Sequence, residues 1–251
     1  MRIYPICGLM FLFLFAVSAK AEDTADKPLS AAEQEAKSAF ESAINAMQGG
    51  PRVIALGDGA DAKLNIPDGY GFIPKNEGGR FMRAIGNQVD ERFQGLIVPA
   101  DRNSAMWMMN VTYNPEGYIK DDDAKDWNPD DLLKSMQEGA EASNKDRAAR
   151  GIPEIEVAGW VEKPQYDAST HRLVWSLAVR DKGQAPGSEE GVNYNTLMLG
   201  RAGFISMNLI PGRSRIDALK PVAKELLAGV EFDNGKKYAD FNAETDKVAE
   251  Y

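Results

Sequence analysis

The chain has 251 residues, of which 29 are basic and 38 acidic, and its formal net charge at pH 7 is −9. This balance argues against a nucleic-acid partner, which needs clustered Lys and Arg, and against docking of the protein surface on anionic lipid headgroups. The only cysteine, Cys7, lies close to the N-terminus. The rest of the chain therefore has no thiol for a disulfide, a nucleophile or a metal site.

Residues 1–21 have the pattern of a secretory signal peptide. Arg2 supplies a positive start, residues 6–17 form an apolar run, and residues 19–21 read Ala-Lys-Ala, an A-x-A cleavage site. We expect cleavage after residue 21 and export, with an uncleaved anchor as the alternative. Cleavage removes one Arg, one Lys and the cysteine, so the remaining charge is 27 − 38 = −11.

Residues 22–50 are predicted to form a polar segment followed by a helix. Ser30 and Glu33 have the spacing of a capping box, and good helix formers follow as far as Met47. Gly49-Gly50-Pro51 then ends the helix.

Short elements are expected between residues 51 and 127. Alternating apolar residues and intervening turn residues predict strands at 52–56, 62–66, 93–98 and 106–113, and a short helix at 77–85. In the last of these strands one face is strongly apolar, and consists of Trp107, Met109, Val111 and Tyr113.

The clearest helix is predicted from Asn128 to Arg150. Asn128 is a suitable N-cap, Pro129 suits the first helical position, and two aspartates follow at the positive end of the helix dipole. Apolar residues recur at spacings of three and four along it, which indicates one buried face.

Strands are predicted at residues 155–163, 172–180, 192–199 and 204–210, and a helix from Ser214 to Ala228. The short connections between these strands favour antiparallel pairing. The predicted fold class is α+β: a twisted antiparallel sheet of six or more strands, flanked by helices. We assign residues 51–235 to one globular domain and residues 236–251 to a C-terminal segment.

His171 is the only histidine, so any Ser-His-Asp or histidine-metal site would depend on it. It lies in a turn that enters a strand, where an exposed, non-catalytic histidine is the simpler interpretation. The chain after residue 21 has no G-x-S-x-G and no S-x-x-K motif.

Acidic residues cluster at Asp121-Asp122-Asp123 and again at 126, 130 and 131. Their oxygens could bind calcium, but the spacing does not match an EF-hand loop. A solvated loop followed by a helix start explains the same residues. The glycines match neither a P-loop nor a dinucleotide-binding fingerprint, and we expect no cofactor and no metal.

Four residues are candidates for a binding surface: Trp160, Tyr166, Tyr194 and Arg201. The aromatic residues, with Trp127, could line a groove for a peptide or a glycan, although core packing is the common role of such residues. Arg201, with Arg213 and Arg215, could hold a carboxylate or a phosphate, or be scattered surface charge.

Several sequence strings resemble the bacterial family called domain of unknown function 2167. They are found at residues 66–70 with Phe72, 159–160 with 164–167, 193–196 with 199–201 and 203, and 237–241 with 246–249 and Tyr251. The resemblance covers nearly the whole chain after residue 21. The order of strands and helices is also similar to that of the PsbP and Mog1 proteins, in which an antiparallel sheet lies between helices.

The resemblance implies a membrane-anchored envelope protein of bacteria, hence a periplasmic location. Family members continue past the Asp-Lys-Val-Ala string into a hydrophobic segment, which implies an anchor beyond Tyr251; a soluble form is the alternative. The family has no established activity, so the resemblance transfers no catalytic residue.

The leading hypothesis is a non-catalytic binding or accessory module whose partner is an envelope protein or a small ligand. One alternative is a hydrolase that uses a carboxylate, with Asp167 or the Asp121–Asp123 cluster as general base. Another is a structural subunit of a membrane complex, docked through an exposed apolar patch.

Overall fold

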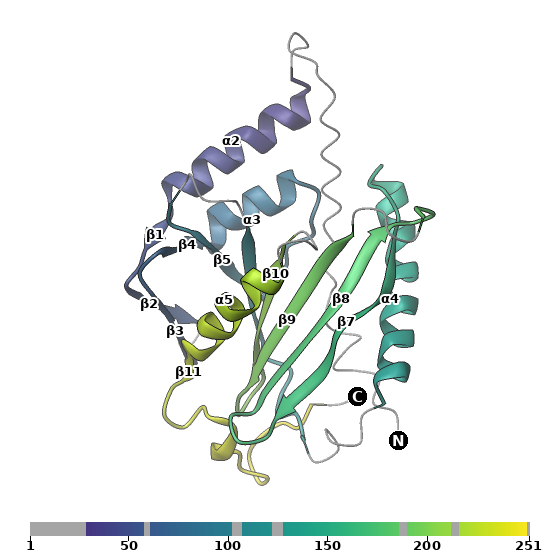
Figure 1. The fold of residues 1–251 in the computed structure, drawn as a ribbon. Coiled ribbons are helices and arrows are strands. Elements are labelled where there is room, and N and C mark those ends of the chain that lie inside the picture. The colour runs from purple at the N-terminus through teal and green to yellow at the C-terminus, as the bar shows by residue number, and fades with distance from the viewer. Residues whose placement is uncertain are drawn as a thin grey trace.

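The computed structural model describes residues 29–57, 61–101, 107–121, 128–185, 190–211 and 216–249. The chain forms a large antiparallel sheet of eight strands in the order β1-β4-β5-β6-β10-β9-β8-β7 (Figure 1). Their bounds are β1 Gln48–Gly49, β4 Tyr70–Pro74, β5 Phe93–Pro99, β6 Met108–Asn114, β7 Ile155–Asp167, β8 Arg172–Asp181, β9 Gly191–Leu199 and β10 Phe204–Ile210. The predicted α+β class and antiparallel sheet are confirmed.

A second, three-stranded antiparallel sheet has the order β11-β3-β2. It consists of β2 Arg52–Leu56, β3 Ala62–Ile66 and β11 Val230–Phe232. The sequence pattern predicts β2 and β3 with these bounds, whereas β11 follows directly after a helix and is too short to show a period.

Within the described residues, four α-helices and one 3-10 helix accompany the sheets. They are α2 Ala31–Asn45, α3 Lys75–Ala84, α4 Pro129–Ala149, α5 Ile216–Ala228 and η3 Tyr238–Asp240. The capping box of Ser30 and Glu33 and the N-cap of Asn128 are both present. Within the described residues, none of the helices has the length and the hydropathy needed to cross a membrane.

The two long later helices cover opposite faces of the large sheet. α4 packs on β7, and α5 packs on β9 and on the small sheet, while α3 covers β4 and β5 and carries α2 on its outer side. Strand β8 shows the division, because Leu173 and Trp175 belong to the apolar cluster that includes α4, whereas Val174 between them packs against the cluster that includes α5.

Two tight turns define the end of the sheet where the candidate site lies. One joins β7 to β8 and the other, residues 200–203, joins β9 to β10. The second turn requires glycine at Gly203, whose φ is +155° and where a Cβ atom would lie 2.0 Å from the carbonyl oxygen of Asn114. The C-terminal segment returns to this end, with a bridge between Gly200 and Lys237.

Candidate functional site

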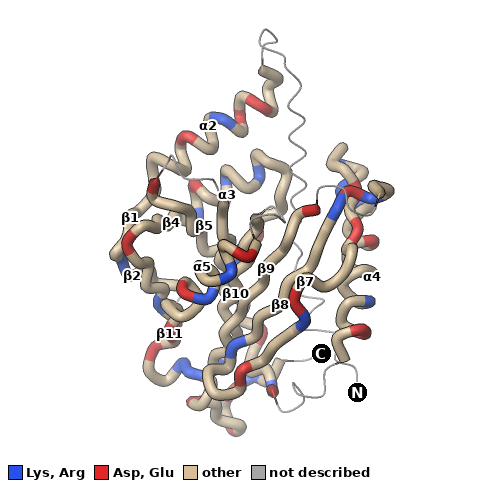
Figure 2. Tube along the Cα trace, viewed as in Figure 1, with Lys and Arg blue, Asp and Glu red and all other residues tan. Residues whose placement is uncertain are grey.

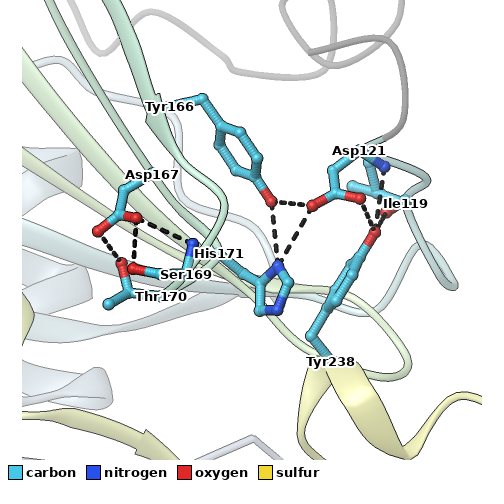
Figure 3. A network of polar contacts seen from close by, with 8 residues as sticks. All are labelled: Ile119, Asp121, Tyr166, Asp167, Ser169, Thr170, His171 and Tyr238. Carbon is cyan, nitrogen blue, oxygen red and sulfur yellow. Dashed lines mark hydrogen bonds and ion pairs between the residues drawn. The ribbon is translucent and has the colours of Figure 1, made fainter. Parts of the chain in front are cut away.

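Three segments that are distant in sequence bring a polar cluster together at this end of the sheet (Figure 3). Asp121 comes from the chain after β6, Tyr166 and His171 from the β7–β8 hairpin, and Tyr238 from η3. His171 has a left-handed backbone conformation, with φ of +52°, which allows the tight turn that returns the chain to β8.

The Asp121 carboxylate is the centre of the cluster. Its Oδ2 accepts a hydrogen bond from the Tyr166 hydroxyl and lies 3.2 Å from His171 Nδ1. Its Oδ1 accepts from the Tyr238 hydroxyl at 2.9 Å, and the Asp121 backbone N–H donates to that hydroxyl at 3.1 Å. The ring of His171 stacks on Tyr238 with 4.1 Å between centroids. Both carboxylate oxygens are therefore engaged within the protein.

The electrostatics of the cluster keep the acid ionised and the phenols protonated. Burial acts to raise the pKa of Asp121, but hydrogen bonds from Tyr166, Tyr238 and His171 outweigh it, and the pKa lies below its ordinary value. Burial, and then the neighbouring Asp121 carboxylate, raise the pKa of Tyr166. A carboxylate with a lowered pKa and no free oxygen is a poor general base.

The cluster also holds the C-terminal segment against the sheet. Tyr118 stacks on Tyr238 and on Phe241, with centroid separations of 4.5 and 3.8 Å. The backbone of Tyr118 pairs with this segment, since its N–H donates to the carbonyl of Lys247 at 2.8 Å and its carbonyl accepts from the N–H of Ala249 at 2.9 Å.

Arg201 fastens the same segment from the β9–β10 turn. Its guanidinium donates to both oxygens of Asp246, at 2.7 and 2.8 Å, and to the carbonyl of Gly235 at 3.0 Å. The hydrogen bonds from Arg201, then that from the N–H of Asn242, lower the pKa of Asp246. Arg201, for which the sequence suggests a carboxylate or phosphate ligand, thus binds a carboxylate of the same chain, that of Asp246.

A groove of about 380 Å³ lies on the other face of the same hairpin, between the hairpin and α5. Its walls are formed by Gln165, Tyr166, Asp167, Thr170, Arg172, Val174, Lys224 and Leu227. Across the hairpin, Asp167 pairs in register with Arg172, and Gln165 with Val174, which places these residues on the α5 side.

The four predicted binding residues do not form one surface. Trp160 donates its ring N–H to the carbonyl of Pro129 at 3.1 Å and so joins β7 to the start of α4. Tyr194 is fully buried in the apolar cluster under α5, and burial raises its pKa. Tyr166 belongs to the polar cluster and Arg201 to the C-terminal fastening. Trp127, Arg213 and Arg215 lie outside the described residues, as do Asp122, Asp123 and Asp126.

Sequence reasoning missed the groove cations, Arg172 and Lys224, and the tyrosine at 238. Arg172 occupies the first position of a strand and Lys224 the polar face of an amphipathic helix, where a basic residue is ordinary. Tyr238 belongs to one of the strings shared with the resembled family, but nothing local indicates that it contacts Asp121. In the part of the chain that the structure describes, no group of three or more His, Cys, Asp and Glu could hold a metal ion.

Comparison with known proteins assigns the chain to a family. A family model described as "Protein of unknown function (DUF2167)" matches residues 48–251, so the chain belongs to this family, as its sequence strings indicate. No curated protein matches the chain.

Solved structures with a similar fold include a PsbP protein and two structures of Mog1. Cyanobacterial PsbP from Synechocystis has 11% identity and a TM-score of 0.41, and the match covers 74% of this chain and 98% of that one. A mutant of Mog1 has 10% identity and a TM-score of 0.39, with 72% and 95% covered. The Ran-binding protein Mog1p of Saccharomyces cerevisiae has 10% identity and a TM-score of 0.39, with 74% and 96% covered.

Proposed function

We propose that this chain is an exported, non-catalytic binding module of the bacterial cell envelope, held at the membrane in its cellular form. The observation that supports this most directly is the groove between α5 and the β7–β8 hairpin, which combines two cations with an apolar wall. Its volume of about 380 Å³ lies within the ~300–1,000 Å³ typical of small-ligand sites.

The hydrogen bonds of the polar cluster and of the adjacent turn argue against hydrolytic catalysis. A hydrolytic His needs a nucleophile or a water activated beside it, and a general base needs a pKa near the working pH. The nearby hydroxyls of Ser169 and Thr170 donate instead to Asp167, at 2.6 and 2.8 Å, and point away from His171 (Figure 3). These hydrogen bonds lower the pKa of Asp167 to about 2, which makes it a weak base.

The sequence pattern of residues 1–21 supports the export part of the proposal. The signal pattern of residues 1–21 predicts transfer out of the cytoplasm, and a chain without further cysteines needs no oxidative folding there. Cell fractionation of the protein expressed from its native gene tests this part. Recovery in the membrane fraction, released only by detergent, is expected, and recovery in the cytoplasm would refute it.

The binding role is tested by photo-crosslinking in living cells. A photo-crosslinking residue that replaces Thr170 lies in the groove. One that replaces Lys134 lies on α4, on the opposite face of the sheet. Lys134 is a suitable control because its side chain is 75% exposed. We expect an adduct at position 170 that is absent at position 134 and is lost when Arg172 is changed to Gln. Identical adducts at both positions, or none at position 170, would contradict the proposal.

A further inference from the structure

We infer that the groove between α5 and the β7–β8 hairpin binds the free C-terminal carboxylate of a peptide whose last side chain is apolar. This inference rests on the proposed binding function and names the ligand class. Three features of the groove support it: two cations without an ionic partner among the described residues, a weakly positive total charge, and adjacent apolar and polar walls.

Arg172 is the better-placed cation. It is half-buried at the start of β8, and its Nε is buried with no hydrogen-bond partner among the described residues. Among the described residues its guanidinium donates one side-chain hydrogen bond, a weak one from Nη2 to the Met198 sulfur at 4.0 Å. A buried guanidinium N–H without an acceptor is costly, and a carboxylate is the acceptor that a guanidinium fork suits best.

Lys224 supplies the second cation from the facing helix. Another lysine of α5, Lys220, contacts Glu162 at 3.4 Å and Asp217 at 3.5 Å, whereas the described residues offer Lys224 no such partner. Lys224 is exposed and lines the groove. Within the described residues, therefore, Lys220 beside β7 has ionic partners and Lys224 beside the groove has none.

The total charge of the groove fits a ligand with a single negative charge. Asp167 also lines it, but its carboxylate accepts from the backbone N–H of Ser169 at 2.9 Å and from the hydroxyl of Thr170 at 2.8 Å. It therefore stays in the turn and does not pair with Arg172, its partner in register. Two cations and one anion leave a charge of +1.

The walls favour a peptide end over a bare anion. Val174 and Leu227 offer an apolar contact, and Gln165 and Thr170 offer polar groups that suit a peptide amide. Figure 2 shows acidic and basic positions interspersed along the described part of the Cα trace. One carboxylate beside one apolar side chain matches a groove that has two cations and an apolar wall.

The test measures binding of N-acetyl-Ala-Leu, with a free carboxylate, to the exported protein by titration NMR. The same dipeptide as its C-terminal amide, and inorganic phosphate, are the comparison probes. We expect the acid to bind about tenfold more tightly than the amide, the effect of one charge-assisted hydrogen bond, and more tightly than phosphate. Shifts should centre on Val174 and Leu227.

Variants assign the effect to the groove. Arg172→Gln and Lys224→Gln should each weaken binding of the acid by about tenfold, and Asp167→Asn should strengthen it because an opposing charge is removed while the turn keeps an acceptor. Lys145→Gln, an exposed α4 substitution, should change nothing. Since Lys224 is exposed, its variant tests the inference even if a change at Arg172 disturbs folding.

Equal binding of acid and amide, no binding of either, or equal binding of phosphate would overturn the inference. Failure here is distinguishable from failure of the proposed function. An adduct at position 170 in cells, with no preference for the free acid, would retain a binding groove and reject the peptide carboxylate as its ligand. Loss of both results would reject both.

Discussion

Two residues in the core, Ser176 and Tyr194, have buried hydroxyls that form no hydrogen bond with the described residues. Neither residue has exposed surface. An unpartnered buried hydroxyl loses its bonds to water without replacement, which opposes folding.

Tyr194→Phe should therefore leave the free energy of unfolding unchanged or raise it by up to about 1 kcal/mol. Urea denaturation followed by tryptophan fluorescence measures this. Tyr194→Leu serves as the matched control, because it also removes the hydroxyl but loses ring packing and should destabilise. A clear loss of stability in the Phe variant would show that the hydroxyl has a partner that stabilises the folded state.

Asp121 is the residue whose charge the polar cluster depends on. Asp121→Asn weakens the hydrogen bonds from Tyr166 and Tyr238 and should lower the free energy of unfolding at pH 7 by about 1–3 kcal/mol. Because the folded state lowers the pKa of Asp121 from the ordinary 3.8, its stabilisation is complete above that value and disappears as pH falls through the lower, folded pKa.

Denaturation curves of the wild type and Asp121→Asn at pH 7, 5 and 3 test this sign. The difference between the two proteins should be largest at pH 7 and pH 5 and should shrink at pH 3. A difference that grows on acidification would mean that the carboxyl group is protonated in the folded state.

At the scale of elements, one buried side chain of α4, that of Asn144, fixes the position of the helix relative to β7. Asn144 is 3% exposed and bonds both backbone groups of Ile155, donating to its carbonyl at 2.9 Å and accepting from its N–H at 2.9 Å. Ile155 is the first residue of β7, so the amide replaces the strand partner that this residue lacks on its outer side.

Asn144→Ala should lower the free energy of unfolding by about 2–3 kcal/mol, since two buried backbone groups lose their partner. It should also speed amide exchange at Ile155. Lys145→Ala, the neighbouring exposed position, controls for the change in helix propensity. Equal free energies of unfolding for the two variants would mean that water bonds the backbone of Ile155 as well as the Asn144 side chain does.

The C-terminal segment is held by one ion pair in addition to its contacts with Tyr118. Arg201→Gln removes the ion pair with Asp246, and residues 236–249 should then exchange amide hydrogen faster while β9 and β10 exchange as before. The folded state lowers the pKa of Asp246, so the ion pair should persist in mild acid and the wild-type segment should keep its protection at about pH 4. Hydrogen exchange by mass spectrometry measures both, and unchanged exchange in the variant would show that stacking on Tyr118 is sufficient.

Local patterns were sufficient for elements that carry their own start, stop and period. Capping residues identify α2 and α4, and alternation identifies β2, β3 and β10 with the bounds that the structure has. The two-residue β1 and the three-residue β11 are too short to show a period. β4 begins at Tyr70, directly after turn-forming residues, so the local sequence indicates a turn and not a strand there. These strands exist because partners elsewhere in the chain pair with them.

At the scale of the whole molecule, the same limit applies to the candidate site. The sequence predicts that Tyr166 and His171 lie close together, because they are five positions apart on either side of one turn. Asp121 and Tyr238 are separated by 117 positions, and only the order of strands brings them together. The groove is likewise made by a hairpin and a helix whose contact depends on the assembled sheet. Residue patterns predict such neighbours only after the topology is known.

The sequence alone supports one prediction for the whole molecule, which is that export removes residues 1–21. Because residues 19–21 follow the apolar run as a cleavage site, the exported protein should begin at Glu22 and lack Cys7. Intact-mass spectrometry of the envelope fraction should then find an N-terminal residue of Glu and no reaction with a thiol reagent. Ala21→Leu should block processing and leave a longer, thiol-reactive chain, because the cleavage site needs small residues. A wild-type chain that retains its thiol would instead identify the apolar run as an uncleaved anchor, which would place the groove on a protein tethered at its N-terminus.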